Sequence, residues 1–238
     1  MNEPKKKFKI VTDTRARVLL PNTLTLIGVC IGLSSINFAL NQNFKLAIVA
    51  ILFAAIIDGL DGRIARLIKG TSKVGKELDS LTDVISFGVA PAFIMYFWIL
   101  NSLGKIGWLL SLMHVICVAL RLARFNINTN SDSSWRDNFF EGVPSPAGGI
   151  LVLSPLIYDV SGLGILSLNY QFITPIIFIF TSILLISKIP TYSLKKIIVP
   201  RSSTVFLLFG IILLFGLLLI FTFKALVIGC LIYILAIP

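Results

Sequence analysis

Long apolar segments recur along the whole chain, and short stretches rich in charged and polar residues separate them. An α-helix needs roughly 20 apolar residues to cross the hydrocarbon core of a bilayer, and most of these segments approach that length. The pattern therefore predicts an all-α fold, a polytopic membrane helical bundle in one domain. About eight transmembrane helices are expected, at residues 20–40, 44–67, 78–100, 104–125, 146–160, 170–188, 203–221 and 224–237.

Composition agrees with a membrane location. Hydrophobic residues make up 56% of the sequence, charged residues make up 13%, and the mean hydropathy is +0.94. A soluble domain has too little interior to bury so much apolar surface. The net charge of +10 does not indicate a nucleic-acid partner, because excess Lys and Arg is usual on the cytoplasmic side of membrane proteins. The single histidine, His114, lies inside an apolar run and is expected to be a packing residue.

The basic residues predict how the spans are oriented. With a cytoplasmic N-terminus and alternating helices, all but three of the 21 Lys and Arg residues fall on the cytoplasmic side. The exceptions are Lys45, Lys105 and Lys224. Residues 1–19 form a basic juxtamembrane segment, in which residues 8–19 are either a short helix on the membrane surface or part of a disordered tail.

Four aspartates lie at the ends of two segments that otherwise suit lipid. Asp58 and Asp61 close the second span, and Asp79 and Asp83 open the third. Spacings of three and four residues place each pair on one helical face. Two antiparallel helices joined by a loop of about ten residues can turn these faces together, so four carboxylates are expected to converge near the cytoplasmic surface.

Converging carboxylates predict a metal site, because unneutralised they would repel one another in apolar surroundings. A carboxylate set without His or Cys favours a hard divalent cation, Mg²⁺, Mn²⁺ or Ca²⁺. Two ions would balance four carboxylates, and a metal pair suits displacement at phosphorus. A cation transporter is a distant alternative, disfavoured because the acidic residues gather at one membrane face.

Small residues accompany the aspartates. Gly62 and Ala65 follow Asp58 on the same helical face, and Gly75 precedes Asp79 by about one turn. They leave room for a ligand, although small residues also serve close helix packing in membranes.

Residues 58–83 resemble the signature of the CDP-alcohol phosphatidyltransferase family. The signature reads D-x-x-D-G-x-x-A-R-x8-G-x3-D-x3-D, and this chain fills it with Asp58, Asp61, Gly62, Ala65, Arg66, Gly75, Asp79 and Asp83. The resemblance implies a metal-dependent membrane enzyme, usually a homodimer, that moves a phosphatidyl group from CDP-diacylglycerol to an alcohol and releases CMP. It also implies a six-helix catalytic core over residues 20–200, followed here by a C-terminal transmembrane hairpin over residues 201–238.

The resemblance implies roles for individual residues. The implied metal ligands are Asp58, Asp61, Asp79 and Asp83, of which Asp83 would also be the catalytic general base. The implied nucleotide and phosphate site comprises Asn22, Thr25, Gly62, Ala65, Arg66 and Gly75. Arg66 either touches phosphate or braces the loop. The motif PNTLT, which holds Asn22 and Thr25, has an ordinary helix start at Pro21 as its alternative.

The acceptor alcohol is argued from other stretches. Residues 79–92, 121–128, 139–149 and 188–195 resemble the phosphatidylserine synthase subgroup, which implies L-serine and a prokaryotic cytoplasmic membrane. Arg121 and Arg124 share a helical face and match a carboxylate or a lipid phosphate, unless they are ordinary cytoplasmic positive charge. Ser145, in a turn rich in Gly and Pro, either shapes the acceptor pocket or only turns the chain. Glycerol 3-phosphate, inositol phosphate and choline stay open as acceptors.

Overall fold

The fold is a helical bundle, seen in a computed structural model that describes residues 14–68, 72–128, 139–164, 169–187, 190–192 and 220–236. Its α-helices are α1 (Thr14–Leu40), α2 (Phe44–Leu67), α3 (Lys73–Asp83), α4 (Ala90–Trp98), α5 (Lys105–Asn128), α6 (Ser145–Val152), α7 (Ser154–Ser161), α8 (Tyr170–Ile186) and α10 (Thr222–Leu235). A π-helix, η1 (Val84–Val89), and a 3₁₀-helix, η2 (Leu100–Leu103), lie on either side of α4. Two short strands, β1 (Phe139–Glu141) and β2 (Pro190–Tyr192), pair with each other.

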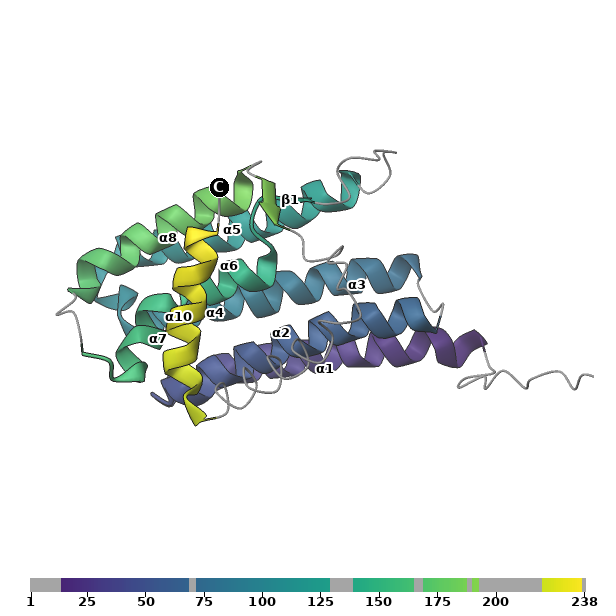
Figure 1. Cartoon of the computed structure of the whole chain (residues 1–238), viewed down its shortest axis with the longest axis horizontal. Coiled ribbons are helices and arrows are strands. Elements are labelled where there is room, and N and C mark those ends of the chain that lie inside the picture. Colours follow the sequence, from purple (N-terminus) through teal and green to yellow (C-terminus); the bar gives the residue numbers. More distant parts are fainter. Residues whose placement is uncertain are drawn as a thin grey trace, which may run out of the picture.

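The helices lie in layers (Figure 1). The hairpin of α1 and α2 forms one side, α3, η1 and α4 run through the middle, and α5 pairs with α8 on the other side. The short helix α6 packs between α8 and the middle layer, α7 follows it toward one end of the bundle, and α10 crosses over them. In this arrangement the end of α2 and the start of α3 lie beside α1, away from the short helices.

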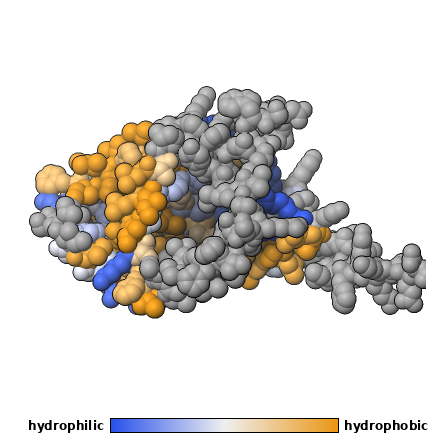
Figure 2. Space-filling model, in the orientation of Figure 1, coloured by the Kyte–Doolittle hydropathy of each residue, from blue (hydrophilic) through white to orange (hydrophobic). Residues whose placement is uncertain are grey.

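In the part of the chain that the structure describes, three stretches are long and apolar enough to cross a membrane, namely Leu19–Leu40, Val74–Trp98 and Lys105–Ile127, and α8 and α10 are shorter apolar helices. Exposed apolar side chains cover much of the visible surface over α8 and α10 (Figure 2), including Phe172, Ile176, Ile228 and Leu231. These helices agree with the predicted membrane bundle. The number of eight spans and the cytoplasmic N-terminus stay predictions, and residues 203–219 of the seventh span lie outside the described residues.

Several predicted boundaries are wrong. The loop after the second span covers residues 68–72 instead of about ten residues, because the Ser72 side chain accepts a hydrogen bond from the Gly75 amide (2.9 Å) and starts α3 early. The fifth span is broken between α6 and α7, since Pro155 has no amide hydrogen to continue the helix. The helix α1 begins at Thr14, ahead of the first span predicted from residue 20, and residues 1–13 of the predicted basic segment lie outside the described residues.

The all-α prediction also missed the strand pair. β1 and β2 are antiparallel, with Phe139 opposite Tyr192 and Glu141 opposite Pro190. The chain leaves β1 through Gly142, whose φ of +76° lies in the left-handed region, and a Cβ there would come within 2.8 Å of the Ser187 carbonyl oxygen. The predicted turn before α6 therefore exists, and a partner nearly fifty residues away along the chain holds it.

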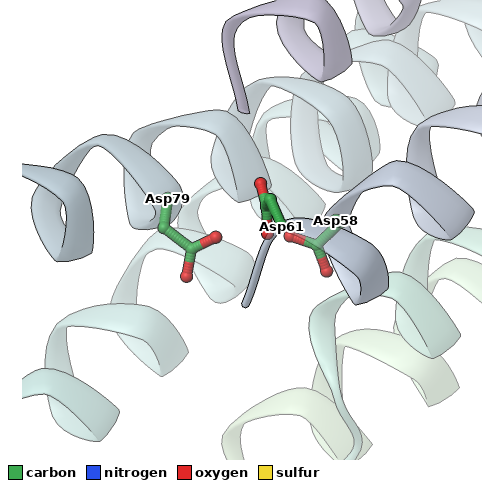
Figure 3. A group of neighbouring side chains, drawn as sticks. All are labelled: Asp58, Asp61 and Asp79. Carbon is green, nitrogen blue, oxygen red and sulfur yellow. The ribbon is translucent and has the colours of Figure 1, made fainter. Parts of the chain in front are cut away.

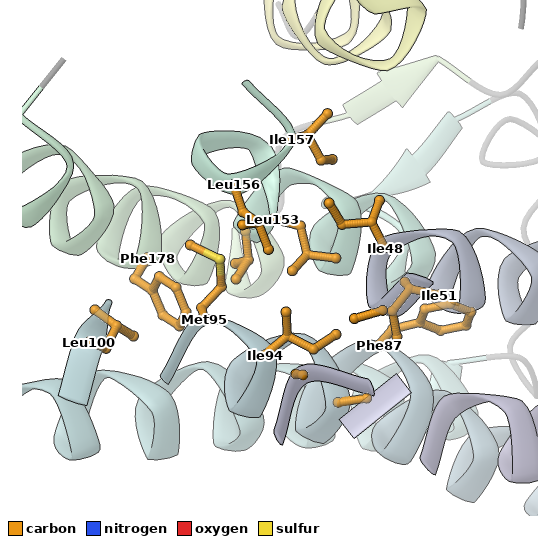
Figure 4. Packing of buried hydrophobic residues seen from close by; sticks show 14 of the residues in the cluster. Ile48, Ile51, Phe87, Ile94, Met95, Leu100, Leu153, Leu156, Ile157 and Phe178 are labelled. Atoms are coloured by element: carbon orange, nitrogen blue, oxygen red, sulfur yellow. The ribbon is translucent and has the colours of Figure 1, made fainter. Parts of the chain in front are cut away.

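The main hydrophobic core joins the middle layer to its neighbours (Figure 4). Phe87, Ile94 and Met95 of the middle layer pack with Ile48 of α2 and Phe178 of α8, and all five side chains are fully buried. Since lipid tails are as apolar as these side chains, such a core stabilises a membrane bundle mainly through close van der Waals packing. The core therefore fixes η1, the element that directly follows Asp83.

The π-helix η1 is clamped on several sides. A π-turn leaves a local irregularity in the helical hydrogen bonding and often marks a functional position. The Phe87 carbonyl lies 3.3 Å from Nε2 of His114 on α5, and the Ser86 hydroxyl lies 3.4 Å from the Gly28 carbonyl on α1. His114 is fully buried, as expected for a packing residue, and its hydrogen bond also ties α5 to η1.

Replacement of Gly149 by alanine is expected to destabilise this region. A Cβ on Gly149 would lie 3.0 Å from the Phe87 carbonyl oxygen and 3.2 Å from its Cα, both backbone atoms that cannot rotate away. Such overpacking costs about 1–3 kcal/mol, so thermal unfolding in detergent micelles should occur at a lower temperature. The matched control is Gly229→Ala on α10, where no atom of the described neighbouring elements lies within 4 Å of the new Cβ and the midpoint should not fall.

Candidate metal and substrate site

Aspartates of α2 and α3 converge as their spacing predicted. One carboxylate oxygen from each of Asp58, Asp61 and Asp79 lies within 4.8 Å of the others. In Figure 3, Asp79 approaches from α3 while Asp61 and Asp58 come from the last turns of α2. Asp61 is only 3% exposed, which is unusual for a carboxylate and requires a compensating partner.

Asp83 is the last residue of α3, one helical turn after Asp79. The Asp58 side chain contacts both Asp79 and Asp83, so the fourth aspartate joins the same cluster. The Oδ1 atom of Asp83 is buried and has no hydrogen-bond partner among the described residues. An unpaired buried carboxylate oxygen is costly, so this atom is available to a ligand or to a proton.

Helix α1 supplies a partner for the buried Asp61. The Thr25 hydroxyl lies 2.7 Å from Asp61 Oδ2 and 3.0 Å from the Pro21 carbonyl. Its single proton serves the shorter contact, because a charged acceptor makes the stronger hydrogen bond. The alternative that Pro21 starts a helix is wrong, since Pro21 lies inside α1.

A cavity of about 200 Å³ opens beside the aspartates. It is lined by Pro21, Asn22, Thr25, Asp61, Gly62, Ala65, Arg66, Ser72, Gly75, Lys76 and Asp79. All six residues predicted for the nucleotide and phosphate site are therefore brought together. Sequence reasoning did not assign Ser72 and Lys76 to the site, although both lie within the signature stretch next to Gly75.

The two glycines of the cavity have different surroundings. Among the described residues, no atom outside its own helix lies within 4 Å of a Cβ built on Gly62, so this position does not pack against any of the described neighbouring helices. A Cβ on Gly75 would come within 2.8 Å of Asn22 Oδ1, so Gly75 lets α3 approach α1 closely. Arg66 donates from Nε to the Gly62 carbonyl (3.0 Å), which holds its guanidinium along its own helix at the cavity wall.

The two arginines of α5 have separate partners. Arg121 Nη1 donates to the hydroxyl of the fully buried Ser145 at the start of α6 (2.5 Å). Arg124 donates instead to the backbone carbonyl of Ile186, the last residue of α8 (2.8 Å). Arg121 also lies within electrostatic range of Asp83. Arg121 thus lies between Ser145 and the aspartate cluster in its interactions, whereas Arg124 donates to a carbonyl group at the C-terminal end of α8.

The donor set fits a hard divalent cation. Asp58 makes carboxylate–carboxylate contacts that would be repulsive without a bridging cation or proton. Asp83 adds a buried oxygen without a partner, and oxygen-only ligands are those that Mg²⁺, Mn²⁺ and Ca²⁺ prefer. The residues present therefore match the chemistry of such ions.

Comparison with known proteins gives several relatives. A protein from Mycobacterium leprae named CDP-diacylglycerol–serine O-phosphatidyltransferase is 40% identical over 193 residues, 76% of this chain and 61% of the relative. Relatives of the same name from Helicobacter pylori and Bacillus subtilis are 45% identical over 141 residues and 34% identical over 162 residues, respectively. The alignments cover 59% and 67% of this chain, and 58% and 89% of the relatives.

The chain thus spans about three fifths of the mycobacterial relative and nearly nine tenths of the Bacillus one. The family model for CDP-alcohol phosphatidyltransferases matches residues 18–187, which include every aspartate of the cluster. With its three long apolar helices, the protein is an integral membrane protein. It belongs to the CDP-alcohol phosphatidyltransferase family.

Proposed function

We propose that the protein transfers the phosphatidyl group of CDP-diacylglycerol to the hydroxyl of L-serine, forming phosphatidylserine and CMP. The observation that carries this proposal is the convergence of Asp58, Asp61 and Asp79, with Asp83 in contact with Asp58, beside a cavity whose lining includes Gly62, Ala65 and Gly75. The names of the relatives from three bacterial genera support serine as the acceptor.

Asp58, Asp61, Asp79 and Asp83 would hold divalent cations, Mg²⁺ or Mn²⁺, and two ions would balance their charge. Bound there, the ions would neutralise phosphate charge and stabilise the leaving oxygen. Thr25 keeps the Asp61 carboxylate in one orientation through its hydroxyl. Both the kind and the number of ions are part of the proposal.

The cavity would take the cytidine nucleotide and its phosphates. Gly62 leaves open space, and Gly75 and Asn22 close the wall where α3 approaches α1. The apolar outer surface of the helices would let the two acyl chains stay in the bilayer. Arg66, fixed to the Gly62 carbonyl, adds positive charge at the cavity wall.

Asp83 would act as the general base. Its Oδ1 atom is buried and available, so it can take the proton of the serine hydroxyl as that oxygen attacks phosphorus. The bond from serine oxygen to phosphorus forms, the bond from phosphorus to the CMP oxygen breaks, and CMP leaves with that electron pair. Arg121, held by Ser145 near Asp83, would attract an anionic group of the acceptor.

The cellular setting completes the proposal. We place the site at the cytoplasmic face of a prokaryotic inner membrane, because basic residues concentrate at that end of the spans. A homodimer is the expected assembly. The core would cover residues 20–200, and an additional hairpin is proposed for residues 201–238, of which α10 is the described part.

An acceptor panel tests the function. The purified protein is incubated with CDP-diacylglycerol, Mn²⁺ or Mg²⁺, and L-serine, glycerol 3-phosphate, inositol phosphate or choline. We expect CMP release and phosphatidylserine, identified by mass, with L-serine alone, and loss of both when EDTA is added. Release with another acceptor would keep the phosphatidyl transfer and discard serine. Folded protein that releases no CMP with any acceptor would discard the enzyme function.

A further inference from the structure

Buried polar atoms without partners gather at the acceptor side of the cluster. Among the described residues, six side-chain atoms are buried and have no hydrogen-bond partner, and Asp83 Oδ1, Arg121 Nε and the Tyr233 hydroxyl are three of them. Such atoms are rare in folded proteins because each forfeits its hydrogen bonds to water. Three in one neighbourhood, from α3, α5 and α10, indicate a place for a polar ligand.

Arg121 connects the other two groups. Its guanidinium interacts electrostatically with both Asp83 and Tyr233. One of its amino groups is engaged by Ser145, which is fully buried, so the guanidinium has a fixed position. An arginine has five N–H donors, and Nε is left for a further acceptor.

The helix α10 brings Tyr233 to this position. Tyr233 packs with Cys230 and Ile234 against Val143, beside the start of α6, and against Leu184 near the end of α8. Figure 1 shows α10 crossing in front of α6, with its last turns pointing toward α5 and α8. The ring of Tyr233 is therefore held by apolar contacts, and its buried hydroxyl has no hydrogen-bond partner among the described residues.

We propose that Tyr233 and Arg121, with Arg121 held by Ser145, bind the carboxylate of the amino-acid acceptor and thereby make the enzyme selective for L-serine. This inference rests on the proposed function and extends it to a helix outside the region that the family model matches. Arg121 and Tyr233 would donate hydrogen bonds to the carboxylate of L-serine, and the Asp83 carboxylate would accept the proton of its hydroxyl. Choline has no carboxylate and would leave the buried donors unpaired, which is the strongest basis for rejecting a substrate.

Tyr233→Phe tests the proposal, because it removes the hydroxyl and keeps the ring. The full-length protein is assayed for CMP release with L-serine and with serinol, in which a hydroxymethyl group replaces the carboxylate. We expect kcat/KM for L-serine to fall about tenfold, mainly through KM, as loss of one charge-assisted hydrogen bond predicts. The value for serinol and the KM for CDP-diacylglycerol should stay within about twofold.

A control and a second variant separate binding from folding. Tyr96→Phe removes the hydroxyl of a tyrosine on α4 whose ring packs against Phe97 and Trp108. The ratio of L-serine to serinol activity in this variant should equal the wild-type ratio. Arg121→Lys keeps the positive charge but loses the planar fork, and should lower the same ratio as Tyr233→Phe does.

The outcomes distinguish the two proposals. An equal loss with both acceptors, or none, in Tyr233→Phe would overturn the carboxylate site while wild-type serine turnover still supported the function. Wild-type protein that released no CMP with any acceptor would overturn both. A selective loss for L-serine in Tyr233→Phe and Arg121→Lys, but not in Tyr96→Phe, would establish the site.

Discussion

Replacing Asp83 with asparagine is expected to reduce serine-dependent CMP release by roughly 1,000-fold, while CDP-diacylglycerol still binds. Asparagine has nearly the same shape, so the packing of α3 against η1 should survive. Its amide cannot take a proton from the serine hydroxyl, and the buried Oδ1 position, which has no partner among the described residues, is where that proton would go. Initial rates and equilibrium binding of CDP-diacylglycerol, measured on the same preparation, separate the two effects.

Asp159→Asn is the matched control for this substitution. Asp159 is an exposed aspartate near the end of α7, outside the cluster, and its replacement should leave the rate within about twofold of wild type. Wild-type turnover in Asp83→Asn would exclude Asp83 as the base. Loss of CDP-diacylglycerol binding would show instead that Asp83 contributes chiefly to binding that substrate.

The site was largely predictable because its residues are close in sequence. Asp58 and Asp61 share a face through helical periodicity, and Asp79 follows on the next helix, so a single hairpin brings them together. Gly62 and Gly75 lie in the same stretch. The Ser72 cap that shortens the loop had a recognisable local signal, a serine three residues before an amide that it caps, although the polar residues after it suggest a longer loop.

Features that depend on distant partners were not predictable. The β1–β2 pair joins residues about fifty positions apart, and neither strand is long enough to show a period. Arg121 and Arg124 share a helical face, yet Arg121 meets Ser145 and Arg124 meets the end of α8. Which partner each arginine finds follows from how α6 and α8 pack on α5, a tertiary property without a local sequence signal.

Tyr233 illustrates the same limit. In the sequence it is one phenol in an apolar helix, and aromatic residues at helix ends are common at membrane interfaces. The position of its hydroxyl becomes apparent only in the fold, where Cys230 and Ile234 pack α10 against Val143 and Leu184. Since family signatures describe residues near the chemistry, an added helix that contributes to specificity lies outside them.

Asp61→Asn is expected to lower the affinity for Mn²⁺ by at least about 100-fold, with a comparable loss of CMP release, because it removes an anionic ligand from the most buried corner of the cluster. Thr25→Val should have a smaller effect, about 10- to 100-fold, since the carboxylate stays and only its hydrogen bond is lost. Thr25→Ser keeps the hydroxyl and should approach wild type. Titration of Mn²⁺ by electron paramagnetic resonance measures the affinity without relying on turnover.

The relative losses of Mn²⁺ affinity in these variants test whether the ion binds at the aspartate cluster. If Asp61 only stabilised the fold through Thr25, both substitutions would shift thermal unfolding alike and Mn²⁺ affinity would follow neither. A graded loss of affinity, largest in Asp61→Asn, partial in Thr25→Val and absent in Glu77→Gln, an exposed carboxylate on α3 outside the cavity lining, requires the ion to sit on the cluster itself. Equal affinity in all three variants would place the ion elsewhere, and the general-base role of Asp83 would then have to stand without a metal beside it.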